Sequence, residues 1–128
     1  MRTSTLIAAA VLAASAAGAA QAYEVDWKRG RVYFRQICTS CHLSQAKKTI
    51  APNERTKADW AAYLQADKHM KGKDTAKQYF SKPYRAGIKG SNAAAAKFAD
   101  VPEQDLMEDV RGFLLKGAKD GDAPASCS

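Results

Sequence analysis

Residues 30–42 read GRVYFRQICTSCH, and this stretch carries the strongest pattern in the chain. Two cysteines, Cys38 and Cys41, are separated by two residues, and His42 follows the second one directly. Apolar residues precede them at positions that share one face of a helix, and Asp26 is of a type that caps helix N-termini. The sequence therefore predicts a helix from Asp26 to about Ser40.

A C-x-x-C-H sequence is the attachment motif of a covalently bound c-type haem. Each thiol can add to one vinyl group of the porphyrin, and the gap of two residues on a helical turn suits the spacing of the vinyls. The residue after the second cysteine then lies under the iron, where an imidazole nitrogen can coordinate it. We therefore expect one haem c, held by Cys38 and Cys41. We expect His42 to be the proximal axial ligand of the iron, with its other ring nitrogen held by a backbone carbonyl.

Three other interpretations of the two cysteines are weaker. A thioredoxin-like redox pair also has the C-x-x-C spacing, but it lies at a strand-to-helix junction within a βαβ pattern, and no such pattern occurs. A structural zinc ion needs two more ligands, and only His69 and Cys127 remain. A disulfide between Cys38 and Cys41 would close a very short loop and would stabilise the fold little.

The first 22 residues, MRTSTLIAAAVLAASAAGAAQA, have the features of a cleavable export signal. Arg2 precedes an apolar run that begins at Leu6, and small residues close the segment before Tyr23. A transmembrane anchor is the weaker interpretation, because the run is alanine-rich and shorter than the roughly 20 strongly apolar residues of a span. We expect residues 1–22 to be removed and residues 23–128 to form one soluble periplasmic domain. Packing alone gives a domain of that size only marginal stability.

Further residues around the motif strengthen the haem prediction. Gly30, Phe34 and the C-x-x-C-H sequence together resemble the N-terminal helix of class I c-type cytochromes. Residues 106–114 resemble the C-terminal helix of that family, which packs on the first helix. The resemblance implies an all-α, small cytochrome c-like fold in which the two helices cross beside the haem, with Val110 and Phe113 as the partners of Gly30 and Phe34. A glycine at such a crossing lets the helix axes approach closely.

The rest of the mature chain is predicted to be helical or irregular. Thr56 and Asp59 have the spacing of a capping box, although Asp stands in place of Glu. Gly72 is expected to end that helix, Pro83 to interrupt the next one, and Gly117 to end the last. No alternating strand pattern and no internal repeat occurs. The expected order is a loop over residues 43–55 and helices over 56–72, 74–85, 91–98 and 101–117.

The second axial ligand of the iron is where this sequence departs from the family. The resemblance implies a methionine in the loop before the C-terminal helix, but residues 87–101 contain neither Met nor His, and Met107 falls inside that helix. The adjacent residues His69 and Met70 remain, and both types are known haem-iron ligands. Adjacent helical residues point about 100° apart, so only one of them can reach the iron. The family habit favours Met70, and the alternatives are His69 and an iron with an open position.

The formal net charge of +7 is unevenly distributed along the chain. Between Lys47 and Lys97 there are twelve basic and four acidic residues, whereas residues 100–122 contain seven acidic and three basic ones. A basic face would steer an electron carrier toward redox partner proteins with acidic docking surfaces, and the alternative is that the lysines only keep the protein soluble. Nucleic-acid binding is not expected, because no module combines basic and aromatic residues.

We therefore expect a periplasmic monohaem cytochrome that carries single electrons between redox partner proteins and is not an enzyme by itself. The alternatives are a haem-bearing subunit of a periplasmic oxidoreductase and a ligand-binding haem protein with an open distal site. Cys127 is left over once haem takes two cysteines, so a disulfide-linked dimer or a mixed disulfide through Cys127 is a further expectation.

Overall fold

The structure is a computed structural model that describes residues 21–126. The segment 1–20, which holds most of the predicted export signal, lies outside the described residues, and so does Cys127. Within the described range the fold is all-α, as predicted, and the only β-type pairing there is a single bridge between His69 and Asp74. Its α-helices are α1 (Trp27–Tyr33), α2 (Lys57–Ala66), α3 (Lys82–Ile88) and α4 (Glu103–Gly117).

The first helix is longer than α1 alone. It continues as the π-helical segments η1 (Phe34–Thr39) and η2 (His42–Ala46). The side chain of Asp26 caps it, because a carboxylate oxygen accepts hydrogen bonds from the backbone N–H groups of Lys28 and Arg29 at 3.1 and 3.0 Å. The predicted start is confirmed. The loop predicted from residue 43 is wrong in its first part, since the helix ends only where Lys47 adopts a left-handed backbone conformation (φ 55°).

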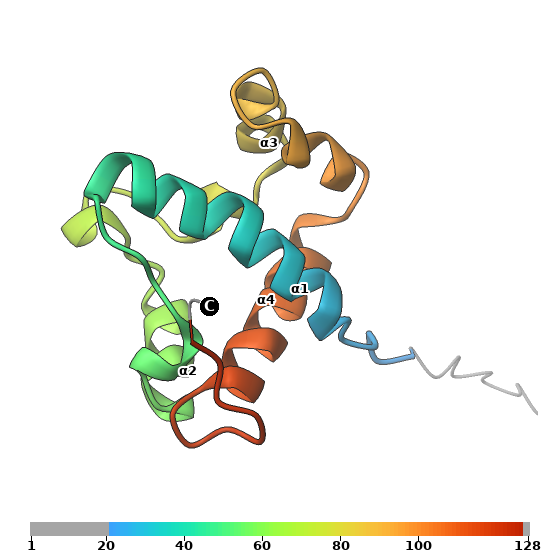
Figure 1. Cartoon of the computed structure of the whole chain (residues 1–128). Helices are drawn as coiled ribbons and strands as arrows, with labels where there is room; N and C mark the ends of the chain where they lie inside the picture. The colour runs from blue at the N-terminus through green and yellow to red at the C-terminus, as the bar shows by residue number, and fades with distance from the viewer. Residues whose placement is uncertain (1–20, 127–128) are drawn as a thin grey trace, which may run out of the picture.

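Helices α1 and α4 cross at close range (Figure 1). Gly30 lies against the backbone of Asp109 and Val110, and a Cβ atom built on this glycine would be 2.0 Å from the Asp109 carbonyl oxygen. Further along, the rings of Phe34 and Phe113 pack with their centroids 5.6 Å apart. These are the contacts expected between the two ends of the chain, and only a residue without a side chain allows the first of them.

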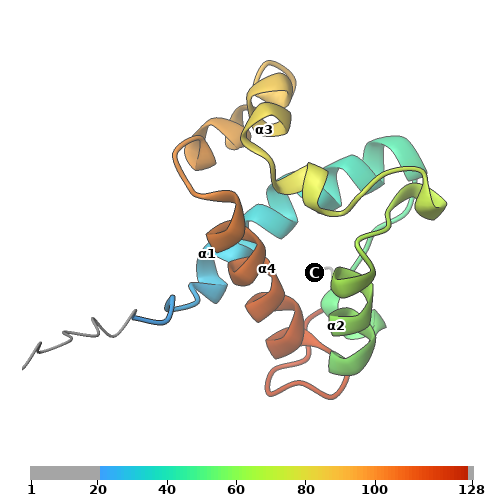
Figure 2. The same ribbon diagram turned by 180° about the vertical axis from the view of Figure 1, so that it is seen from behind.

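Helices α2 and α3 lie on opposite sides of the long N-terminal helix, as both views of the ribbon show (Figure 1 and Figure 2). The core fills the space where these elements meet α4. It joins aromatic residues from separate parts of the described chain to the aliphatic face of α4, which explains why residues 21–126 hold together without strands. Its buried residues are Tyr33, Phe34, Ile37, Trp60, Phe80, Ala95, Phe98, Leu106, Val110, Phe113, Leu114 and Ala118.

Helix α2 begins as predicted and ends early. The Thr56 hydroxyl accepts from the backbone N–H of Asp59 at 3.2 Å, and the Asp59 carboxylate accepts from that of Thr56 at 3.3 Å, which completes the capping box. The predicted end at Gly72 is wrong. The helix stops at Ala66, because Asp67 adopts a left-handed conformation (φ 50°). A turn follows in which the N–H of His69 donates to the carbonyl of Asp74 at 2.8 Å.

The single helix predicted over residues 74–85 is two elements, the 3₁₀-helix η5 (Lys77–Phe80) and α3. Pro83 does not interrupt a helix but lies in the first turn of α3, where its missing N–H costs nothing. The alanine-rich segment forms a 3₁₀-helix, η6 (Ala93–Phe98). Two further 3₁₀ turns, η3 (Pro52–Glu54) and η4 (Met70–Gly72), lie in the connections, and α4 ends at Gly117 as predicted.

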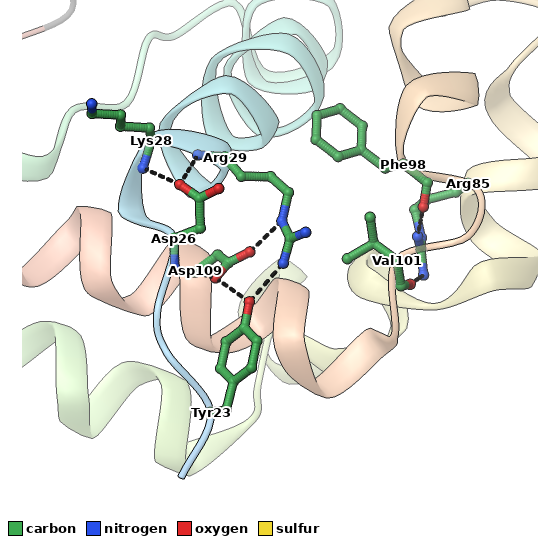
Figure 3. Close-up of polar contacts among 8 residues, drawn as sticks. All are labelled: Tyr23, Asp26, Lys28, Arg29, Arg85, Phe98, Val101 and Asp109. Carbon is green, nitrogen blue, oxygen red and sulfur yellow. Dashed lines mark hydrogen bonds and ion pairs between the residues drawn. The ribbon is translucent and has the colours of Figure 1, made fainter. Parts of the chain in front are cut away.

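Asp109 is a buried polar hub on α4 (Figure 3). Its carboxylate is fully buried and pairs with the Arg29 guanidinium, with 2.5 Å between Nε and Oδ2. The same carboxylate accepts from the Tyr23 hydroxyl and from the backbone N–H of Asp26, both at 2.7 Å. Partial burial, together with the hydrogen bond to Asp109, raises the pKa of Tyr23 to about 12, so its hydroxyl stays a donor at neutral pH. This network ties the start of the domain to its last helix.

Substituting Asp109→Asn is expected to lower the free energy of unfolding by about 3 kcal/mol, because Arg29 then loses its buried counter-charge. Urea denaturation at neutral pH measures the loss. The matched control is Asp100→Asn, which removes an exposed carboxylate and should change stability by less than about 0.5 kcal/mol. Equal midpoints for the two variants would contradict the role assigned to Asp109.

Arg85 is a buried exception among the basic residues of the segment 47–97. Its side chain is 1 % exposed and donates to the backbone carbonyls of Phe98 and Val101, the second at 2.9 Å (Figure 3). It therefore stabilises the turn before α4 and does not contribute to a charged surface. The other basic residues of this segment are exposed, apart from Lys71, whose side chain the structure does not describe.

Candidate functional site

The C-x-x-C-H motif lies where the two π-helical segments of the first helix meet. Cys38 is in η1, Cys41 precedes η2, and His42 is its first residue. All three side chains are half-buried, and both cysteines are free thiols. Desolvation, followed by the neighbouring Cys41, raises the pKa of the Cys38 thiol to about 12. A redox-active C-x-x-C pair requires a lowered thiol pKa, so this environment disfavours a thioredoxin-like activity.

The fold brings the two histidines of the chain together. The rings of His42 and His69 are in edge-type contact, with their centroids 5.8 Å apart and an angle of 64° between their planes. A metal ion bound to one nitrogen of each of two imidazoles, at about 2.0 Å per bond, holds the ring centres about 6 Å apart. Two imidazoles at this spacing, together with two free thiols in C-x-x-C-H spacing on the same helix as His42, fit a covalently attached haem with a histidine on each face.

Desolvation lowers the pKa of His42, and the nearby imidazole of His69 adds to this effect. Burial disfavours the cationic form of His42, and so does a neighbouring imidazole that can itself become cationic. His42 is therefore held as the neutral imidazole, which is the form that binds metal ions.

Three tyrosines form an aromatic wall beside His69. Tyr79 is in edge contact with the His69 ring at 4.6 Å and with Tyr84 at 5.0 Å. Tyr63 lies 2.6 Å from Nδ1 of His69 through its hydroxyl oxygen. The sequence predicted no role at the site for any of these three tyrosines. The only signal in the sequence was the position of Tyr63 just upstream of His69, which a wrong helix end at Gly72 obscured.

Met70 is not brought to the motif in the same way. Its side chain is 59 % exposed, and its sulfur lies 3.4 Å from the hydroxyl of Tyr79. Its backbone has a positive φ of 42°, which turns the chain sharply after His69. The two candidates for the second axial ligand are therefore separated by the structure, with the imidazole facing His42 and the thioether sulfur beside Tyr79.

A buried hydroxyl within the motif lacks a partner. Thr39, between the two cysteines, has its oxygen buried without a hydrogen bond to any residue between positions 21 and 126. It lines a pocket of about 170 Å³ whose walls are largely apolar and include Phe34, Pro52 and Phe113. An unpaired buried hydroxyl beside an apolar pocket fits a site that takes up a further group.

No protein-family model matches this chain, and no curated protein or solved structure is significantly similar to it. Among the residues that the structure describes, no helix is long and apolar enough to cross a membrane. No group of three or more His, Cys, Asp or Glu side chains within that same range is arranged so that it could hold a metal ion by itself. A haem iron needs no such group, because the porphyrin supplies four of its ligands.

Proposed function

We propose that this protein is a monohaem c-type cytochrome that carries single electrons between redox partner proteins. The observation that carries the proposal is the opposition of His42 and His69 at 5.8 Å beside two free cysteines in C-x-x-C-H spacing. The close crossing of α1 and α4 at Gly30 supports a small cytochrome c-like arrangement, since it matches the contact that the family resemblance implies.

Each part of the site has a role in this proposal. Cys38 and Cys41 would hold the porphyrin through two thioethers, and His42 would ligate the iron from the motif side. A bound haem supplies a reversible one-electron iron couple. The half-buried rings of Tyr63, Tyr79 and Tyr84 would keep water from one side of the site. The lower local dielectric would then change the free-energy difference between the oxidised and reduced iron.

The opposed histidines favour an electron carrier over the ligand-binding alternative. An iron with a protein side chain on each face has no open position for a small molecule or a substrate. This also agrees with a carrier that has no turnover of its own. A role as the haem-bearing subunit of a periplasmic oxidoreductase uses the same site and differs only in the presence of a larger catalytic chain.

The proposal includes export to the periplasm with removal of residues 1–22. Tyr23, the residue after the expected cleavage point, takes part in the Asp109 network. Arg29 donates to the same tyrosine hydroxyl at 2.6 Å, so Tyr23 is tied to the rest of the domain. A processing site directly before Tyr23 would keep these contacts.

Acidic redox partners are part of the proposal. Lysines from the segment 47–97 are exposed, and a positively charged surface accelerates association with a negatively charged protein. Partner proteins with acidic docking surfaces should therefore exchange electrons faster at low ionic strength.

The direct test is to produce the full-length chain in a bacterium with an active c-type haem attachment system and to analyse the exported protein. We expect a mature chain that starts at Tyr23, carries one covalent haem by mass spectrometry and titrates as a reversible one-electron couple. The ferric iron should be six-coordinate at neutral pH. A chain without covalent haem, or a five-coordinate high-spin ferric spectrum, would overturn the proposal.

A further inference from the structure

We infer that His69, and not Met70, is the second axial ligand of the iron, and that Tyr63 is a positioning residue that orients its imidazole. The inference rests on the proposed haem site and specifies which side chains complete it. It departs from the methionine that the family resemblance favours. Three features of the chain carry it. They are the placement of the two imidazole rings, the orientation of the Met70 side chain and the hydrogen bond on Nδ1 of His69.

The first feature is the ring placement. Residue 69 lies far along the chain from the motif, yet its ring is 5.8 Å from that of His42. The turn that carries His69 is closed by two backbone hydrogen bonds, from His69 N to the Asp74 carbonyl at 2.8 Å and from Gly72 N to the His69 carbonyl at 2.6 Å. A tight turn thus holds the imidazole near the motif. Binding an iron there would therefore cost little further conformational entropy of the chain.

The second feature is the orientation of Met70. Its side chain is mostly exposed, and its sulfur lies beside the Tyr79 hydroxyl, which also donates to the carboxylate of Asp74. Tyr79 is itself anchored, because its backbone carbonyl accepts from the hydroxyl of the fully buried Tyr33. Bringing the Met70 sulfur to the iron would require this anchored turn to rearrange.

The third feature is the state of the two ring nitrogens of His69. The Tyr63 oxygen lies 2.6 Å from Nδ1, so this nitrogen is taken by a hydrogen bond and Nε2 is left as the ligand atom. An Nε2 that binds iron places the ring proton on Nδ1, which then donates to the Tyr63 oxygen. This is the arrangement by which proteins fix the tautomer and the ring angle of a metal-binding histidine.

Tyr63 lies on α2, and the side chains of Arg55 and Trp60 fix its ring. The Arg55 guanidinium lies over the rings of both Tyr63 and Trp60, 5.4 Å from each ring centre, and the Trp60 indole donates to the Pro52 carbonyl at 2.7 Å. The tyrosine ring is also in edge contact with that of Trp60 at 6.0 Å. A hydroxyl on such a fixed ring can orient the imidazole that it touches.

The test uses the holoprotein and three variants, His69→Ala, Met70→Leu and Tyr63→Phe. Covalent haem content is measured first by mass, so that loss of haem, which counts against the proposed function, is separated from a change of ligand. Electron paramagnetic resonance and near-infrared magnetic circular dichroism of the ferric proteins then report the axial ligands. Ligation by two histidines is expected in the wild type and, unchanged, in Met70→Leu. His69→Ala should be high-spin, and added imidazole should restore the low-spin signal.

The role of Tyr63 is read from the rate of cyanide binding to the ferric protein. Loss of the hydroxyl frees the His69 ring, and we expect Tyr63→Phe to bind cyanide about tenfold faster. The matched control is Tyr23→Phe, because the Tyr23 hydroxyl donates to Asp109 at the start of the domain and lies outside the proposed haem site, so this variant should leave the rate unchanged. A methionine–iron absorption band that disappears in Met70→Leu, or an open iron in the wild type, would overturn the assignment of His69. Equal rates in the two tyrosine variants would overturn the role of Tyr63.

Discussion

The double variant Cys38→Ala/Cys41→Ala should be exported without any covalently bound haem. The two thiols are the only proposed covalent links to the porphyrin, so their removal leaves coordination by histidine alone, and such a haem is lost in denaturing solvent. Intact-protein mass spectrometry in acid measures this directly, and the expected result is the mass of the bare chain. Visible absorbance of the denatured band on a gel should vanish with it.

The control for this experiment is Cys127→Ala, which removes the remaining cysteine and should retain one haem per chain. The same variant tests the expectation about Cys127, because a dimer that is visible on a non-reducing gel of the wild type should disappear from it. Covalent haem in the double variant would mean that the motif is not the attachment site. Loss of haem in Cys127→Ala would contradict the assignment of the thioethers to the other two cysteines.

Among changes of a described glycine to alanine, Gly30→Ala is expected to have the largest effect on stability. The new Cβ atom would lie 2.0 Å from the carbonyl oxygen of Asp109 and 2.7 Å from the backbone nitrogen of Val110. Backbone atoms of a helix cannot move aside as a flexible side chain can, so α1 and α4 would have to separate and expose part of the core. We expect a loss of at least about 4 kcal/mol, which is large for one substitution.

Thermal or urea unfolding of the haem-loaded protein measures this loss, with Gly87→Ala as the control. Gly87 is a helical glycine of α3 and a Cβ atom there would meet nothing within 4 Å, so that variant should be as stable as the wild type or slightly more stable. A wild-type-like midpoint for Gly30→Ala would show that the crossing of the two helices is looser than the structure places it.

Local signals in the sequence predicted much of the fold. Asp26 and Thr56 start helices because their side chains satisfy N–H groups only a few residues away, and such contacts depend on short spacing alone. These caps need no knowledge of distant parts of the chain. The crossing of α1 and α4 was expected on another ground, the resemblance of both ends of the chain to class I c-type cytochromes.

The parts that the sequence did not predict depend on the backbone conformation of one turn or on contacts between distant segments. Helix α2 ends at Ala66 because Asp67 is left-handed and the chain then turns between His69 and Asp74, whereas the sequence shows no strong breaker there apart from Gly72. The choice between two adjacent candidate ligands depends on that turn. From the sequence alone, Arg85 is expected to be a surface charge. Its burial depends on the backbone carbonyls of Phe98 and Val101, which lie 13 and 16 residues further along the chain.

The opposition of His42 and His69 has a consequence for how the chain unfolds. If haem is fixed to the first helix and its iron is bound to His69, as proposed, the prosthetic group would act as a cross-link that joins two points of the backbone. A closed loop of roughly 27 residues lowers the entropy of the unfolded chain by about 3.5 kcal/mol at room temperature, as a disulfide of that span would. Reagents that compete for the iron, such as imidazole or cyanide, should therefore open this loop and act as mild denaturants without touching a single side-chain contact of the core.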